Sequence, residues 1–321
     1  MPELEKNVSS DIRPGQEYYV APADEVEVLA TDRVDASGEP TSIWGDAWRQ
    51  LRRNPIFLVA VLLIVAVTVV VLWPGLFTDQ DPRRCLGDDI MAPPRPGHPF
   101  GFDRQGCDVY TRTIYGARAS VLVGLSAAAL FVLIGGTLGA AAGFFGGVLD
   151  EIVSRIAEIF FAIPMMLAAI VLLQMLRPAT MWNVVLVLAS FTWPQAARIA
   201  RGAVIEAKNS EYVTAAKALG VSRTGTLVRH VLPNAAGPLI VVSTIWLGVF
   251  IVTEATLSYL GVGLPPDIVS WGGDIARAKN DLRTSPAILF YPAAALAITV
   301  LSFIMLGDAV RDALDPKARK R

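Results

Sequence analysis

Six apolar stretches of about 20 residues constrain this chain more than any other feature of its sequence. About 20 apolar residues in a helix span the roughly 30 Å hydrocarbon core of a bilayer. Lipid offers no partner to free backbone N–H and C=O groups, so such segments must be helical. We therefore expect an all-α integral membrane protein with six transmembrane helices, at residues 56–74, 119–143, 156–176, 181–199, 237–260 and 286–307.

The composition agrees with this interpretation. Of 321 residues, 53% are hydrophobic and 18% are charged, whereas a soluble globular domain has about 25% charged residues. A chain this apolar needs to bury more surface than a soluble fold of its length does. An ordinary soluble domain is therefore excluded.

Basic residues near the ends of the expected spans predict the orientation. They cluster before the first span, after the fourth and at the C-terminus, and with six spans these places share one side. Lys and Arg are enriched on the cytoplasmic side, so we expect both termini to be cytoplasmic (N-in, C-in). The loop 75–118 also holds six Arg, but six Asp balance them. The clustered residues are Arg49, Arg52, Arg53, Arg198, Arg201, Lys208, Lys217, Arg223, Arg229, Arg311, Lys317, Arg319, Lys320 and Arg321.

The N-terminal segment differs in composition from the rest of the chain. Its first 40 residues hold ten acidic and three basic side chains, without helical or strand periodicity. Such a segment buries too little apolar surface to fold alone, so a disordered cytoplasmic tail is expected. The expected parts are this tail (1–42), the first span with an extracytoplasmic loop (43–118), a core transmembrane domain (119–310) with a cytoplasmic loop (200–236), and a basic cytoplasmic tail (311–321).

Small residues and prolines in the spans predict packing and bends. Gly135, Gly139, Gly143 and Gly147 recur every fourth residue, which places a smooth strip on one helix face for another helix to approach. Pro164 and Pro194 free backbone carbonyls that neighbouring groups must satisfy.

Two carboxylates fall within the expected spans. Glu158 lies near the cytoplasmic end of the third span and Glu254 near the outer end of the fifth. Ionisable groups in a membrane are commonly functional, so both are candidates for the translocation path. Both also lie near an interface, where snorkelling or local hydrogen bonding would satisfy them.

Sequence signatures of catalysis are missing. No G-x-x-x-x-G-K-[ST] phosphate loop and no G-x-S-x-G elbow occurs, and the two histidines, His98 and His230, lie in no ligand cluster. We expect no metal site, no cofactor in this chain, no nucleic-acid partner and no catalytic residue. A membrane-embedded enzyme is disfavoured.

The loop between the fourth and fifth spans predicts a helical hairpin. Asn209 or Ser210 is suited to accept a backbone N–H at the start of a helix that runs to Leu219, and Gly220 is suited to end it in the left-handed conformation. Ser222 would begin a second helix that continues through His230 and ends at Pro233. Helical spacing places Val213, Ala216 and Leu219 with Tyr212 on one small apolar face. Tyr212 and Leu219 would be its anchors, with Ala215, Ala216 and Ala218 allowing close approach. Such a hairpin either lies on lipid headgroups or fits a groove on another protein.

Three motifs resemble one family. Ala215, Ala216, Gly220 and Leu232-Pro233 match the E-A-A-x3-G-x9-I-x-L-P signature of ABC-importer permeases, in which Thr214 and His230 replace the Glu and the Ile. The stretches "YVTAAKALG" and "RHVLPN" are similar to its peptide-and-nickel branch. "HPFGFDRQGCDVYTRTIYGAR", with Phe102 and Cys107 in place of Thr and Arg, resembles the family's entry to the second span. "EATLSYLGVGLPPDIVSWG" resembles another family segment. The resemblance covers about residues 45–315 and is to the second permease subunit of dipeptide, oligopeptide and nickel importers.

The resemblance implies the type I ABC-importer permease fold in the plasma membrane of a prokaryote. It implies a homologous second permease, two ATP-binding-cassette ATPase subunits that bind ATP and Mg²⁺, and an extracytoplasmic solute-binding protein, with lipid around the spans. The hairpin's first helix would then be a coupling helix seated in an ATPase groove. The coupling residues it implies are Glu211, Tyr212, Val213, Thr214, Ala215, Ala216, Ala218, Leu219, Gly220, Arg229, His230, Leu232 and Pro233.

Two transport functions are possible for a membrane protein of this kind. A permease subunit of an ATP-driven importer fits the motifs, and its substrate would be a dipeptide, an oligopeptide, haem or a nickel chelate. A stand-alone secondary transporter or channel would be expected to show inverted repeats or ion-binding groups at the midplane, and neither is visible in the sequence.

The two cysteines, Cys85 and Cys107, both lie in the loop 75–118. In an oxidising compartment a disulfide between them is expected, and Cys107 stands where the resembled family has Arg. The alternative is a pair of free thiols. A bridge closing a loop of this length would stabilise the fold by about 3 kcal/mol on the chain-entropy model.

We predict that a thiol-reactive reagent labels neither Cys85 nor Cys107 in the folded, unreduced protein, because both sulfurs are in the bridge. Alkylation followed by mass determination, with and without reductant, measures this. Ready labelling of both cysteines without reductant would rule the bridge out.

Overall fold

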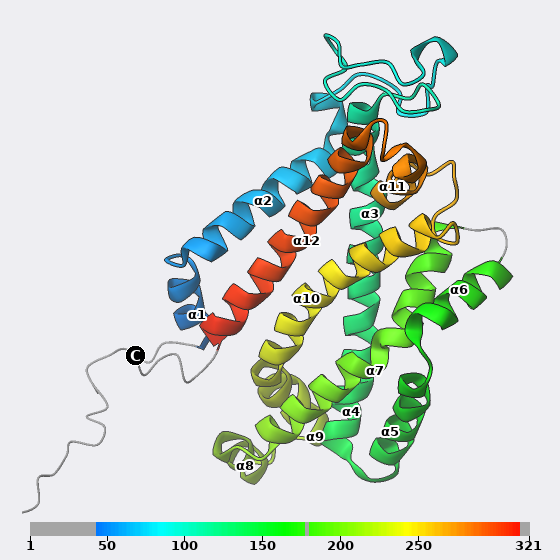
Figure 1. Ribbon diagram of the computed structural model, residues 1–321. Helices are drawn as coiled ribbons and strands as arrows, with labels where there is room; N and C mark the ends of the chain where they lie inside the picture. The colour runs from blue at the N-terminus through cyan, green and yellow to red at the C-terminus, as the bar shows by residue number, and fades with distance from the viewer. Residues whose placement is uncertain (1–42, 177–179, 315–321) are drawn as a thin grey trace, which may run out of the picture. The chain divides into compact units, whose positions relative to one another are not determined.

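The described part of the chain is helical (Figure 1). The computed structural model describes residues 43–176 and 180–314, in which three isolated β-bridges are the extended pairings. The predicted acidic tail, 1–42, and most of the predicted basic tail, 315–321, lie outside the described residues. The all-α prediction is confirmed. The α-helices are α1 (Ile43–Leu51), α2 (Pro55–Leu72), α3 (Val109–Leu130), α4 (Thr137–Phe145), α5 (Gly147–Ala162), α6 (Met165–Met175), α7 (Met181–Lys208), α8 (Glu211–Ala218), α9 (Arg223–Thr226), α10 (Leu232–Tyr259), α11 (Trp271–Ala278) and α12 (Pro286–Leu314).

Four helical runs are long and apolar enough to cross a membrane. Within the described residues they are Pro55–Leu72, Val109–Phe145, Arg223–Tyr259 and Pro286–Leu314. The pair α5 and α6 is a fifth candidate if it counts as one span, and it is bent by 86°. The bend follows Pro164, which stands between the two helices and breaks the helical hydrogen bonding as expected of proline.

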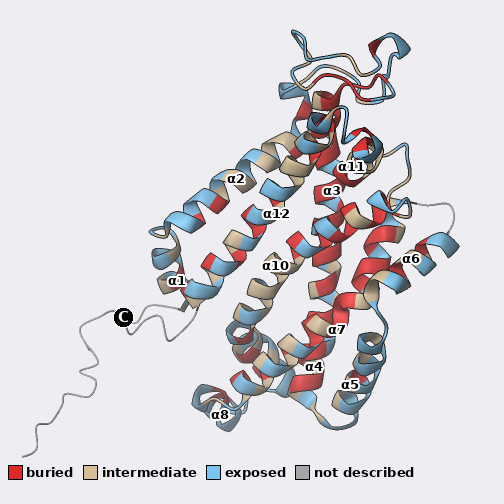
Figure 2. Ribbon diagram, in the orientation of Figure 1, coloured by how far each residue is buried: buried red, intermediate tan, exposed pale blue. Residues whose placement is uncertain are grey.

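The predicted fourth span, 181–199, lies within α7, which is not among these candidates. Polar Asn183, Thr192 and Gln195 lower its hydropathy. The helix also has many buried residues, as the red ribbon of α7 in Figure 2 shows. Because neighbouring helices rather than lipid surround much of α7, its sequence does not need to be uniformly apolar.

The glycine strip brings the second predicted span against α7. A Cβ at Gly135 would lie 2.3 Å from the carbonyl oxygen of Trp193, and one at Gly139 would lie 2.1 Å from that of Ala197. Gly143 meets α7 one turn further on, at Arg201. The packing prediction is confirmed for these three glycines. Gly147 departs from it, because nothing lies within 4 Å of its Cβ position.

The second helix of the predicted hairpin does not end at Pro233, so that prediction is wrong. It continues as one helical run from Arg223 to Tyr259. The widened turn of π-helix at Leu227–Val231 directly precedes α10, and Pro233 lies in the first turn of α10. Proline lacks a backbone N–H, and here it directly follows the π-turn, where the regular α-helical hydrogen bonding is already interrupted.

The described bundle has α8 at one end and the loop 73–108 at the other (Figure 1). We call the first the α8 end; there Trp44 of α1, Tyr212 of α8, Pro233 of α10 and Arg311 of α12 line one groove. We call the other the disulfide end. It carries the loop 73–108, and the start of α3 packs there against Ala278 of α11 and Ile288 of α12. Large apolar side chains such as Leu62 and Leu167 are exposed on outward helix faces, as expected of surfaces that contact lipid.

We predict that Gly139→Ala destabilises the protein, because the added methyl group would overlap the Ala197 carbonyl and push α4 from α7. Overpacking of this kind costs about 1–3 kcal/mol. The apparent unfolding temperature of the detergent-purified protein measures the effect. The control is Gly202→Ala on α7, where a Cβ meets nothing within 4 Å. Equal stability of both variants would contradict the close contact.

Candidate functional site

The helix α8 lies where the sequence predicts it, but its start differs from the prediction. The Ser210 side chain makes no capping hydrogen bond, so the prediction of a side-chain cap by Ser210 is wrong. Instead, the backbone carbonyl of Ser210 accepts from the N–H groups of Val213 and Thr214, while Asn209 ends α7. At the other end, Gly220 has φ +83°, the left-handed conformation expected of a glycine after a helix.

The apolar residues of α8 are divided between two faces. Val213 and Ala216 are both buried, and Val213 packs in a cluster with Val204 and Val231. These two residues hold α8 to the bundle and are not available to a partner, which corrects the expectation of one common apolar face. Leu219 is 85% exposed and Tyr212 44% exposed. The surface that α8 offers therefore comes from Glu211, Tyr212, Thr214, Ala215, Ala218 and Leu219, all of them exposed.

The remaining predicted coupling residues lie in the following turn and helix. Arg229 and Pro233 are exposed, whereas His230 and Leu232 are half-buried. The carbonyl oxygen of His230 accepts a hydrogen bond from Asn234 Nδ2 at 2.7 Å. A groove of about 680 Å³ runs beside α8, lined among others by Tyr212 and Arg311. The α8 end therefore combines a protruding helix with an adjoining groove.

Two contacts that the sequence did not reveal fix the base of α8. Arg201 of α7 forms a two-pronged ion pair with Asp150 of α5, with Nη2 2.6 Å from Oδ2. Lys208, the last residue of α7, donates from Nζ to the carbonyl oxygen of Gly143 at 2.7 Å. A cation near the last carbonyls of a helix is favourable. The last turns of α7 are thereby tied to α4 and α5 just before α8 begins.

At the disulfide end, a bridge joins Cys85 and Cys107 across 22 residues of the loop 73–108. Asp103 lies beside it and accepts the backbone N–H groups of Gln105 and Cys107 on Oδ1 at 2.8 and 2.9 Å. The loop is also tied to the helices, because Arg104 Nε donates to Asp281 Oδ1 at 2.8 Å. The bridge thus fixes a loop that packs on the connection between α11 and α12.

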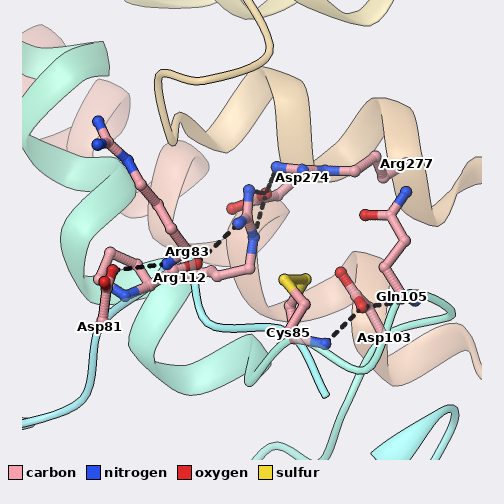
Figure 3. The surroundings of a disulfide bond; sticks show 10 residues. Asp81, Arg83, Cys85, Asp103, Gln105, Arg112, Asp274 and Arg277 are labelled. Atoms are coloured by element: carbon pink, nitrogen blue, oxygen red, sulfur yellow. Dashed lines mark hydrogen bonds and ion pairs between the residues drawn. A yellow bond between two sulfur atoms is a disulfide. The ribbon is translucent and has the colours of Figure 1, made fainter. Parts of the chain in front are cut away.

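One carboxylate joins three segments at this end. Asp274 Oδ1 accepts from Arg112 Nη2 at 2.7 Å and from Arg277 Nη2 at 2.6 Å. Figure 3 shows both guanidinium groups pointing toward Asp274 near the disulfide. Arg112 also donates to the carbonyl oxygen of Pro82 at 2.9 Å. Burial raises the pKa of the Asp274 carboxyl to about 6, against the lowering effect of Arg112, so it is ionised at neutral pH.

The two candidate carboxylates of the translocation path lie in different surroundings and do not meet. Glu158 is exposed on α5 and pairs with Arg155, with Oε2 3.1 Å from Nη1. Glu254 is fully buried in α10 and accepts from Ser258 Oγ on Oε1 at 2.8 Å. Within residues 43–176 and 180–314, no group of three or more His, Cys, Asp or Glu is placed to hold a metal ion.

These features define the class of protein. It is an all-α, multi-pass membrane protein with a small helix protruding at one end and a disulfide-linked loop at the other. Residues 135–320 match the family described as binding-protein-dependent transport system inner membrane component. Residues 42–94 match the N-terminal transmembrane domain of oligopeptide transport permease C.

Curated relatives are similar over most of the chain. An oligopeptide transport system permease protein from Bacillus subtilis is 38% identical, over 91% of this chain and 95% of the relative. A dipeptide transport system permease protein from the same organism is 35% identical, over 98% of this chain and 99% of the relative. A glutathione transport system permease protein from Pectobacterium atrosepticum is 32% identical, over 91% and 97%.

The chain belongs to the binding-protein-dependent transport system inner membrane component family. It is the permease component of an ABC importer, a multi-pass membrane protein of bacteria, and ATP is hydrolysed in partner ATPase subunits rather than in this chain. The family resemblance drawn from the motifs is confirmed, and family membership sets aside the stand-alone transporter and the membrane enzyme.

We predict that Arg112→Ala lowers the apparent unfolding temperature by several degrees, because it leaves the Asp274 charge buried with one cation fewer. Removing one partner of a buried ion pair costs about 3–5 kcal/mol. Arg155→Ala is the control, since it breaks the exposed pair with Glu158, and exposed pairs contribute little. Thermal unfolding of both purified variants makes the comparison, and similar shifts would contradict a structural role for the Arg112–Asp274 pair.

Proposed function

We propose that this chain is one of two homologous permease subunits that enclose the path of an ATP-driven peptide importer. The substrate class is supported by the names of the relatives, which are permeases for oligopeptides, dipeptides and glutathione. All three substrates are peptides. Haem and nickel chelates, also considered from the motifs, have no counterpart among these names.

We further propose six crossings with both termini in the cytoplasm. The four membrane-length runs, the bent pair α5–α6 and the largely buried α7 together supply six. Arg49, Arg52 and Arg53 precede α2, which fits the enrichment of basic residues on the cytoplasmic side. The disulfide fits the opposite, oxidising side. On this orientation α8 is cytoplasmic and the loop 73–108 faces outward.

The coupling role of α8 rests on one observation: its inner face is fixed to the bundle while Leu219 and Tyr212 protrude. Exposed large apolar side chains at the end of a rigid helix are suited to fill a pocket of a partner. The pairs Arg201–Asp150 and Lys208–Gly143 hold the base of α8, so a movement of the partner would pass to α7 rather than be absorbed locally.

We propose the partners that membership of this family implies. Two ATP-binding-cassette subunits would bind ATP and Mg²⁺ and dock at the α8 end, so this chain itself needs no cofactor. A second permease would pack beside the bundle, and a solute-binding protein would deliver substrate at the disulfide end. The fold boundaries at 42, 118 and 310 remain the expected division of the chain.

We predict that Leu219→Asp abolishes ATP hydrolysis that depends on the binding protein, because a carboxylate cannot enter an apolar pocket. Insertion and folding should be unchanged, since Leu219 is 85% exposed. The measurement is the ATPase rate of the reconstituted complex with and without loaded binding protein.

The control is Val148→Asp, which alters a residue 73% exposed at the start of α5, outside α8. That variant should keep coupled hydrolysis. In parallel, Leu219→Cys should cross-link to an ATPase subunit. Cross-links to lipid alone, or full coupling in Leu219→Asp, would overturn the docking role.

A further inference from the structure

A cavity of about 460 Å³ lies at the disulfide end, between the end of α6 and the loop that joins α10 to α11. Its size is within the range of small-molecule sites. Most of its wall is apolar or neutral. The lining residues are Leu173, Gln174, Ser258, Gly261, Val262, Gly263, Leu264, Pro265, Pro266, Ile268, Ser270, Gly273, Ala276 and Arg277.

Arg277 is the one ionisable side chain among the described residues that line this cavity. The Ser258 hydroxyl already has two hydrogen-bond partners. It donates to the buried Glu254 and accepts the backbone N–H of Leu264 at 3.1 Å. Apart from Arg277, the lining residues are therefore neutral. Such a site favours a solute with an apolar body and one anionic group.

The guanidinium of Arg277 keeps hydrogen-bond donors that the protein does not use. Its acceptor, Asp274 Oδ1, is shared with Arg112. A guanidinium has five N–H donors, and the hydrogen bonds of the described chain use one from Arg277. The Arg277 side chain is 29% exposed, which leaves room for a ligand.

The bond to Asp274 also orients the guanidinium. A donor held by packing and a second hydrogen bond loses less conformational entropy when it binds. Arg matches a carboxylate because its planar fork donates two parallel N–H···O bonds. The chemistry of this wall therefore fits a carboxylate on a small, largely apolar molecule.

We propose that the cavity is a substrate subsite in which Arg277 binds the C-terminal carboxylate of the transported peptide. This proposal rests on the proposed function as a peptide importer. It assigns one step of recognition to the permease itself, at the end of the bundle where substrate would arrive. Residues of the loop 260–270 and Gln174 would contact the last side chain of the peptide.

The test uses the permease–ATPase complex in nanodiscs, without binding protein, and a dipeptide with a photo-reactive C-terminal residue. The dipeptide is prepared as the free acid and as the C-terminal amide. The half-saturating concentration for labelling of this chain is measured for each form. In the wild type, labels should fall within Leu173–Gln174 and Gly261–Arg277.

Arg277→Gln should raise the half-saturating concentration of the free acid at least tenfold, the change expected for a lost charge-assisted hydrogen bond. The amide should change less than twofold, and Arg277→Lys should restore part of the difference. The matched control is Arg104→Gln at the same end. Arg104 is 66% exposed, pairs with Asp281 and does not line this cavity, so neither form should change.

Equal losses for the acid and the amide in Arg277→Gln would show a structural role and overturn the proposal. Labels that fall only outside these segments would also overturn it. Uptake of peptide by the complete wild-type assembly in proteoliposomes is measured separately. If that assembly imports no peptide, the proposed function fails; if it does and the acid–amide difference is unaffected by Arg277, only the subsite fails.

Discussion

The contact between α4 and α7 determines where the rest of the α8 end lies. Gly139 and Gly143 leave so little side chain between the two helices that backbone meets backbone. That approach brings Lys208 within hydrogen-bonding distance of the Gly143 carbonyl and lets Arg201 reach Asp150. The helix α8 begins three residues after Lys208, so its position follows from a helix contact formed within the membrane bundle.

The disulfide end is organised by charge rather than by small residues. Asp274 gathers Arg112 from α3 and Arg277 from its own helix, and Arg112 in turn holds the Pro82 carbonyl of the loop. The disulfide and Asp103 give that loop its internal shape. A loop rich in charged residues therefore becomes a rigid cover that rests on α11 and on the connection to α12.

Local features were predictable from the sequence, and contacts between distant segments were not. Gly220 ends α8 with a positive φ because a sequence signal of one residue specifies that conformation. The predicted helix end at Pro233 is wrong because proline occurs both after the end of a helix and in its first turn. The π-turn before Pro233 has no sequence signal that would decide between the two. No sequence pattern singles out Arg277. It shares the Asp274 carboxylate with Arg112, and Arg112 lies 162 residues away from Asp274 in the sequence.

The burial of Val213 and Ala216, but not of Leu219, also depends on contacts between distant segments. Helical spacing placed these residues and Leu219 on one side of α8, but it could not show which part of that side meets the bundle. Val213 joins the buried cluster that holds Val204 and Val231, and Ala216 is buried as well. The helix ends at Ala218, before Leu219 can join them.

The helical run from Arg223 to Tyr259 reaches from the α8 end of the bundle to the disulfide end (Figure 1). Its 37 residues, at 1.5 Å each, measure about 55 Å. One tip is separated from α8 by a short turn, and the other leads straight into the loop 260–270 beside Arg277. Tilting such a rod by about 5° around its middle displaces each tip by about 2 Å. In the proposed importer, a movement of the ATPase at α8 would therefore reach the cavity beside Arg277 through this one helical run.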